Sequence, residues 1–209
     1  MPMTIAKMVQ AAAKAGKSKS KVSPRGYTFG HIVIGKRARQ LLKDSLDRNW
    51  VSGGPNVALF EKRFRETFGF KESVAVASGT AACITQTAAL HEYGAKWGDE
   101  VIVPALSFVA TSNAVLAAGF KPVFVDIERE TLNIDPAKIE RAITKKTRAI
   151  QVVHTMGKPC EMDAILEIAK RRKLIVLEDS CEAHGAKYKG KYVGGMGRAS
   201  AFSFYAAHI

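Results

Sequence analysis

Short apolar runs rich in β-branched residues alternate with longer amphipathic segments along most of the chain. The first amphipathic segment, residues 56–68, repeats apolar positions at spacings of three and four with charged residues between them, which predicts a helix. Six apolar runs of strand length follow: Ser73–Ala77, Val101–Val103, Pro122–Asp126, Ala149–Val153, Leu174–Glu178 and Ala199–Phe204.

Helical patterns fill most of the gaps between these runs: Thr80–Tyr93, Phe108–Ala118, Pro136–Ile143 and Glu161–Arg172. Strands that alternate with helices predict a largely parallel sheet covered by helices on both faces. A small hairpin that turns at Gly190 is predicted over residues 187–192. The predicted fold class is α/β.

The positive charge is concentrated near the N-terminus. The 209 residues hold 32 Lys and Arg against 19 Asp and Glu, a net charge of +13. Ten of the basic residues precede Asp44, the first acid, which leaves 22 basic and 19 acidic residues, or +3, for the rest. We therefore predict a flexible basic arm over residues 1–30 and one domain over 31–209. Alternatives for the arm are a contact with nucleic acid, which is not favoured, and a targeting peptide.

Composition also limits the class of protein. With 47% hydrophobic and 24% charged residues, the chain has the make-up of a globular domain. Cys83, Cys160 and Cys181 are far apart and form no CxxC pair, so we expect buried, reduced thiols and no metal site. No run reaches the roughly 18 apolar residues of a membrane span, and the N-terminus lacks the apolar run of a secretory signal. We expect a cytoplasmic protein without membrane contact.

Candidate chemistry stands where predicted strands end, which is where open α/β sheets bind ligands. Gly79, with Ser78 and Thr80 beside it at a helix start, suits a phosphate, although an ordinary helix cap explains the pattern equally well. Asp179 ends an apolar strand, where a carboxylate could hold a protonated ring nitrogen, a metal or a helix N-terminus. His208 follows the last strand, and a lone histidine is most often structural.

Five segments carry a more specific signal: residues 78–82, 104–111, 121–126, 178–185 and 202–205. In this order and spacing they resemble the pyridoxal-phosphate-dependent sugar aminotransferase family (DegT/StrS-like), from about Gly35 to Ile209. The resemblance implies the large domain of the aspartate-aminotransferase fold, PLP fold type I, without the smaller C-terminal domain of the family. It also implies a nucleotide-sugar substrate and, in the full-length form, a homodimer with its active site between two subunits.

The resemblance implies pyridoxal 5'-phosphate or pyridoxamine 5'-phosphate as cofactor. When bound, the protonated pyridine ring draws negative charge away from the substrate carbon. Family positions imply these contacts: Gly79, Thr80 and Ser203 at the phosphate, Phe108 on the ring face, Asp179 at the ring nitrogen, and Glu182, which stands where the family often has Gln, near the phenolic oxygen.

The last motif departs from most of the family. Its aminotransferases have a lysine five residues after the phosphate-binding serine, and this lysine binds the cofactor covalently. The fifth residue after Ser203 is His208, whose imidazole cannot form that bond but can act as a base near neutral pH. The nucleotide-sugar 3-dehydratases of the family are similar in having histidine there.

We therefore predict an enzyme that removes the C3 hydroxyl of a nucleotide-linked 4-keto-6-deoxy sugar, with His208 as base and Asp179 as the partner of the cofactor ring. Two alternatives stay open. One is a transaminase that makes an amino sugar for polysaccharide biosynthesis, which needs a lysine from elsewhere. The other is an incomplete scaffold that binds cofactor without catalysis.

Overall fold

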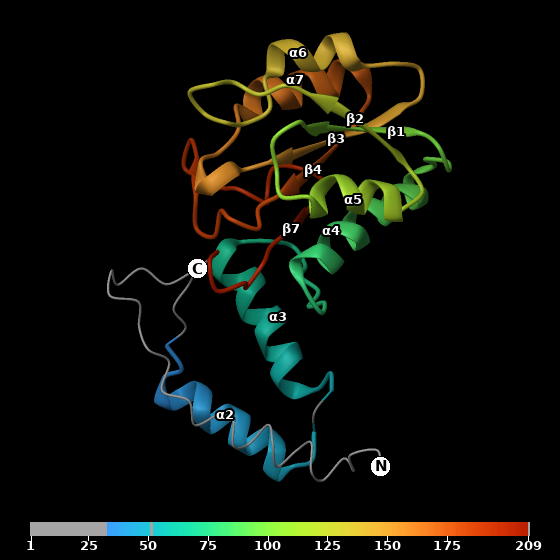
Figure 1. Cartoon of the computed structure of the whole chain (residues 1–209). Coiled ribbons are helices and arrows are strands. Elements are labelled where there is room, and N and C mark those ends of the chain that lie inside the picture. The colour runs from blue at the N-terminus through green and yellow to red at the C-terminus, as the bar shows by residue number, and fades with distance from the viewer. Residues whose placement is uncertain (1–32, 51, 209) are drawn as a thin grey trace, which may run out of the picture.

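A computed structural model of the chain describes residues 33–50 and 52–208, and it confirms the α/β prediction (Figure 1). Five strands form a sheet in which every neighbouring pair is parallel. In spatial order they are β2 (Lys121–Val125), β1 (Glu100–Pro104), β3 (Thr147–Val153), β4 (Ile175–Asp179) and β7 (Ala199–Ala201).

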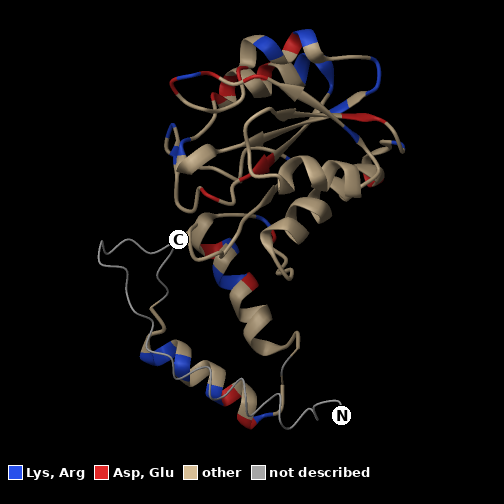
Figure 2. Ribbon diagram, in the orientation of Figure 1, with Lys and Arg blue, Asp and Glu red and all other residues tan. Residues whose placement is uncertain are grey.

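Helices cover both faces of this sheet, as the sequence predicted. One face carries α6 (Pro136–Ala142) and α7 (Met162–Arg172), and the other carries α4 (Gly79–Ala88) and α5 (Ala110–Ala117) (Figure 1). A 3₁₀ turn, Ala89–Tyr93, continues α4. Acidic and basic residues are interspersed on α6 and α7, whereas α4 and α5 have none (Figure 2). The uncharged pair of helices borders the candidate site described below.

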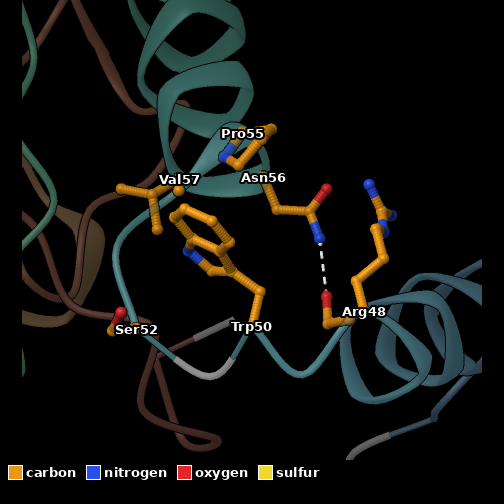
Figure 3. Close-up of a pocket in the computed structure, with 8 residues that line it drawn as sticks. Arg48, Trp50, Ser52, Pro55, Asn56 and Val57 are labelled. Atoms are coloured by element: carbon orange, nitrogen blue, oxygen red, sulfur yellow. Dashed lines mark hydrogen bonds between the residues drawn. The ribbon is translucent and has the colours of Figure 1, made fainter.

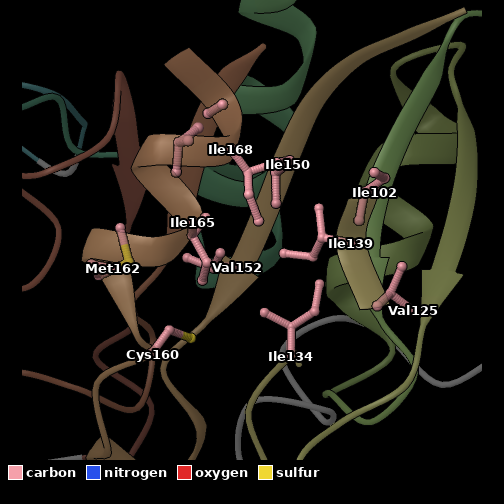
Figure 4. Packing of buried hydrophobic residues seen from close by; sticks show 12 residues of the cluster. Ile102, Val125, Ile134, Ile139, Ile150, Val152, Cys160, Met162, Ile165 and Ile168 are labelled. Carbon is pink, nitrogen blue, oxygen red and sulfur yellow. The ribbon is translucent and has the colours of Figure 1, made fainter. Parts of the chain in front are cut away.

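Alternation along β1 divides the core between the two faces. Ile102 packs with Ile139 of α6 and Ile165 of α7 in one cluster of fully buried side chains (Figure 4). Its neighbours Val101 and Val103 join the cluster on the opposite face. Successive strand residues point to opposite faces, and each buried aliphatic side chain contributes roughly 1.5–3 kcal/mol. Because β1 is covered on both sides, its consecutive residues Val101 to Val103 are all apolar, and the sequence pattern could therefore predict this strand.

The predicted strand at Ser73–Ala77 is wrong. Among the described residues this segment has no strand beside it, and Val74 is 78% exposed. It is held instead to α3 (Pro55–Phe68): the Ser73 hydroxyl donates to the Glu61 carbonyl at 2.6 Å, and the Ala75 amide donates to the Glu61 carboxylate at 2.8 Å. Strand propensity is realised only where a neighbour supplies ladder partners.

An open groove of about 1300 Å³ separates this segment from β7, which is the edge strand of the sheet. Its lining includes residues 73–79 and, from β7 and the turn after it, residues 199–200 and 202–205. β7 is also shorter than the predicted run and ends at Ala201. The groove therefore reaches Gly79 and Ser203 of the predicted phosphate end, whereas Asp179 and His208 are not among its lining residues.

Helix α2 (Lys36–Asp47) was not predicted, and it buries no residue, so its sequence lacks a core-facing stripe. The predicted hairpin is present as β5 (Lys187–Tyr188) and β6 (Lys191–Tyr192), and positive φ angles of 48° at Lys189 and 85° at Gly190 suit a two-residue turn. The predicted arm, residues 1–30, lies outside the described residues. Within the described ranges, no helix is long and apolar enough to cross a bilayer.

Candidate active site

The candidate site lies at the carboxyl ends of the parallel strands. The chain leaves β1 for β2 on one side and then returns to β3 on the other, and such a reversal opens a crevice where open α/β sheets bind ligands. Asp179 ends β4, Ser203 follows β7, and Thr111 lies in the first turn of α5, which follows β1. Three separate connections therefore contribute to one site.

Asp179 is a buried acceptor fixed by three donors. The Thr111 hydroxyl donates to its Oδ2 at 2.8 Å, and the Cys83 thiol approaches the same oxygen at 3.5 Å. The backbone amide of Cys181 donates to Oδ1 at 3.2 Å. The carboxylate is 6% exposed and held in one orientation. A preoriented carboxylate of this kind suits a protonated ring nitrogen.

The neighbouring acid, Glu178, has a structural role. It is fully buried and accepts a hydrogen bond from His154 Nε2 at 3.1 Å and others from the amides of Gly194, Met196 and Gly197. Burial by itself would raise the pKa of Glu178, but the bond from His154 and those from the amides outweigh it and lower the pKa. Glu178 therefore anchors the glycine-rich turn, and only Asp179 faces the candidate site.

The predicted phosphate end brings Gly79 and Ser203 together. A Cβ added at Gly79 would lie 2.7 Å from Ser203 Cβ and 3.3 Å from Cys181 Sγ, so these segments approach this closely only because residue 79 is glycine. Ser78 caps α4 by accepting from the Ala81 amide at 3.1 Å, and Thr80 is exposed on the same turn. A helix N-terminus with nearby hydroxyls is a donor set that fits a phosphate group.

A compact turn connects Ser203 to His208. The Tyr205 amide donates to Ser203 Oγ at 3.2 Å, and the His208 amide donates to the Tyr205 carbonyl at 2.8 Å. The His208 ring lies 5.3 Å from the Tyr205 ring, and its Nδ1 is buried without a partner among the described residues. Burial lowers the pKa of His184, and the nearby His208 lowers it further.

Among the described residues, Phe108 and Glu182 form no hydrogen bond with the other predicted site residues. Phe108 is 68% exposed just before α5. The Glu182 carboxylate accepts from the Met156 amide at 2.8 Å. In the described parts of the chain neither side chain forms a hydrogen bond to Asp179 or Ser203. Ring stacking by Phe108 and a contact between Glu182 and the phenolic oxygen stay predictions.

Three residues around Asp179 were missed from the predicted site: Cys83, Thr111 and Cys181. Thr111 and Cys181 lie within segments that carried the family resemblance, so motif position could have indicated them. Cys83 gave no such signal, because its contact with Asp179 joins residues 96 positions apart. The described cysteines are free thiols, as expected, but Cys181 is only half-buried.

A second, smaller cavity lies at the corner between α2 and α3 (Figure 3). The indole N–H of Trp50 donates to the Gly53 carbonyl at 2.8 Å, and Asn56 Nδ2 donates to Ser45 Oγ at 2.9 Å. Its volume is about 70 Å³, whereas ligand pockets typically measure about 300–1,000 Å³. These contacts hold the helix corner together, and the cavity is smaller than a typical ligand pocket.

Comparison with known proteins identifies the family. The sequence profile of the DegT/DnrJ/EryC1/StrS aminotransferase family matches residues 33–209. The chain belongs to this family. The match confirms the resemblance carried by the five segments, and it begins close to the first described residue.

Two family relatives and one solved structure are similar over most of the chain. Spore coat polysaccharide biosynthesis protein SpsC of Bacillus subtilis is 46% identical over 174 residues, which are 83% of this chain and 44% of that protein. GDP-perosamine synthase of Escherichia coli O157:H7 is 43% identical over 170 residues, 81% of this chain and 46% of that protein. The E. coli GDP-4-keto-6-deoxy-D-mannose-3-dehydratase structure with bound hydrated PLP has a TM-score of 0.77 and 36% identity.

That structural match covers 82% of this chain and 45% of the dehydratase chain. This DegT/DnrJ/EryC1/StrS family chain thus spans less than half the length of the relatives it matches. Together with the parallel sheet and its flanking helices, the matches confirm the large domain of PLP fold type I.

Proposed function

We propose that this chain forms the cofactor-binding half of an enzyme that uses pyridoxamine or pyridoxal phosphate to remove the C3 hydroxyl of a nucleotide-linked 4-keto-6-deoxy sugar. The observation that carries the proposal is His208, the fifth residue after Ser203, held in the Ser203 turn through Tyr205. An imidazole there can take up a proton but cannot bind the cofactor covalently, and dehydration needs only the first ability.

The other predicted site residues would bind different parts of the cofactor. The helix start at Gly79 and Thr80, with the Ser203 hydroxyl, would bind the phosphate. Asp179, fixed by Thr111 Oγ1, would hold the proton on the ring nitrogen. The bound cofactor supplies a ring that draws negative charge away from the substrate carbon. The structural relative, a GDP-4-keto-6-deoxy-D-mannose-3-dehydratase with bound hydrated PLP, supports this assignment.

Transamination is the second candidate, because the family whose profile matches is an aminotransferase family. On this alternative a lysine from elsewhere would replace the function of His208. A scaffold without catalysis is the third, since the chain spans 44% and 46% of its two relatives. A homodimer of the full-length form, a cytoplasmic location and a role in polysaccharide biosynthesis stay predictions.

The test is to incubate the chain with pyridoxamine phosphate and GDP-4-keto-6-deoxy-D-mannose and to identify the sugar product by mass spectrometry. We expect a product that has lost the C3 hydroxyl. His208→Asn should lower its rate by at least about 100-fold, the low end of what a general base contributes, while cofactor binding persists.

His208→Lys is the matched variant. It should lose dehydration and gain a borohydride-trappable bond to pyridoxal phosphate, seen as added mass on the chain. A 4-amino sugar from the unaltered chain would favour the transaminase instead. Cofactor binding without any product would favour the scaffold.

A further inference from the structure

Two thiols and a carboxylate converge at the end of β4. The sulfur atoms of Cys83 and Cys181 and a carboxylate oxygen of Asp179 all lie within 4.8 Å of one another. Cys83 comes from the buried side of α4, Asp179 is the last residue of β4, and Cys181 lies in the turn that follows. No spacing along the sequence predicts such a site, because tertiary contacts alone bring α4 to this strand.

The donor set is that of a thiophilic cation. Zinc binds thiolate sulfur at about 2.3 Å and carboxylate oxygen at about 2.0–2.2 Å, so a tetrahedral site separates two sulfurs by about 3.8 Å. Three protein ligands leave the fourth position open to water. Cys181 Sγ borders the space left by the missing side chain of Gly79, where an added Cβ would lie 3.3 Å from that sulfur. Since the three ligand atoms already lie within 4.8 Å of one another, ion binding requires them to approach by only about an ångström.

The local electrostatics also favour a cation. A divalent ion would offset the negative charge of the Asp179 carboxylate and deprotonate the thiols that it binds. The Asp179 carboxylate is already oriented by Thr111, so this side chain would lose little further conformational entropy when an ion binds.

The geometry points to a site for a thiophilic divalent cation such as Zn²⁺, with Cys83, Asp179 and Cys181 as its protein ligands. Binding releases one proton from each thiol and changes no oxidation state. The site overlaps the carboxylate that we assign to the cofactor ring nitrogen, so ion and cofactor should exclude each other. This exclusion rests on the proposed function, whereas the ion site does not.

The test titrates the reduced 209-residue chain with Co²⁺ alone. We expect one Co²⁺ per chain, thiolate-to-cobalt charge-transfer absorption, tetrahedral visible bands, and displacement by Zn²⁺. Cys83→Ser and Cys181→Ser should each weaken Co²⁺ binding by about 100-fold or more, because loss of outer-shell partners alone typically costs 10–100-fold. If Cys83→Ser disturbs α4, as circular dichroism would reveal, the half-buried Cys181 provides the same test.

Cys160→Ser is the matched control. Cys160 is fully buried elsewhere, and its thiol donates to the Val153 carbonyl at 3.0 Å, so this variant should keep the full cobalt spectrum. Thiolate bands that persist when both Cys83 and Cys181 are serine, or that vanish in Cys160→Ser, would overturn the site. So would Co²⁺ spectra without thiolate bands in the unaltered chain.

A second experiment adds pyridoxamine phosphate to the cobalt-loaded chain. We expect the thiolate bands to fall as the cofactor binds. If the cofactor binds with the bands unchanged, the exclusion is wrong and the ion site stands. If no cobalt binds but the cofactor does, the ion site is wrong and the proposed cofactor site stands.

Discussion

Glu178 and Asp179 are consecutive residues of β4, yet one is a structural anchor and the other a candidate ligand. Consecutive residues of β4 point to opposite sides, so Glu178 enters the interior against His154 while Asp179 meets Cys83 and Thr111. Both are carboxylates at a strand end, and their surroundings alone make the first an anchor and the second a candidate ligand. Substitution at each should therefore have different consequences.

Replacing Glu178 should destabilise the fold. Glu178→Gln turns an amide N–H₂ toward groups that are all donors, namely His154 Nε2 and three backbone amides. We expect the free energy of unfolding to fall by roughly 3 kcal/mol, the upper end of the cost of leaving a buried hydrogen-bonding group without its partner. Urea unfolding measures it. Glu167→Gln is the control, because its pair with Arg171 is exposed at 3.9 Å and should matter by less than about 0.5 kcal/mol.

The same carboxylate predicts a pH dependence of stability. Its pKa in the folded protein is lowered from the ordinary 4.5, so its stabilising contribution is complete above pH 4.5 and is lost as the pH falls through the lower folded value. The difference in unfolding free energy between the unaltered chain and Glu178→Gln should therefore be constant near pH 7 and shrink below pH 4.5. A difference that grows with acidity would contradict this assignment.

At the scale of elements, the first turn of α4 is positioned by contact with the turn after β7. That contact depends on Gly79, since an added Cβ would lie 2.7 Å from Ser203 Cβ. Ser203 in turn is connected through Tyr205 to His208. The phosphate end and the candidate base are therefore parts of one packed unit.

Gly79→Ala should separate these two turns. We expect a loss of about 1–3 kcal/mol in unfolding free energy from overpacking, and a fall of at least about tenfold in affinity for pyridoxal phosphate, equal to about 1.4 kcal/mol. Equilibrium unfolding and a cofactor absorbance titration measure the two effects. Gly53→Ala is the matched control, because a Cβ there meets nothing within 4 Å; equal effects of both variants would refute the argument.

At the scale of the whole molecule, the excess positive charge and the candidate site residues lie in different parts of the chain. Ten basic residues precede Asp44, while the helices nearest the site, α4 and α5, have no charged residue (Figure 2). The net charge of +13 thus says little about the groove between residues 73–79 and β7. A polyanion contact, if any, belongs to the N-terminal residues.

Removing residues 1–30 tests this separation. The deletion takes away six Lys and Arg and no acid, so the net charge falls from +13 to +7. The shortened chain should elute from heparin at lower salt, since polyanion binding weakens as cationic contacts are lost, with cofactor binding unchanged. Retention at the same salt concentration would exclude a nucleic-acid contact through the arm.

Sequence by itself determined the parallel α/β fold, because strands such as Val101–Val103, buried on both faces, are apolar throughout. It also indicated Gly79, Asp179, Ser203 and His208, since strand ends and motif spacing are local properties. It could not show that Ser73–Ala77 lacks a strand partner.

Only the tertiary structure assigned Glu178 to the interior and brought Cys83 to Asp179. Those outcomes depend on which segments, distant along the chain, become neighbours. Local propensity carries no information about that choice, because the energy of a buried contact is set by both partners and by the space between them.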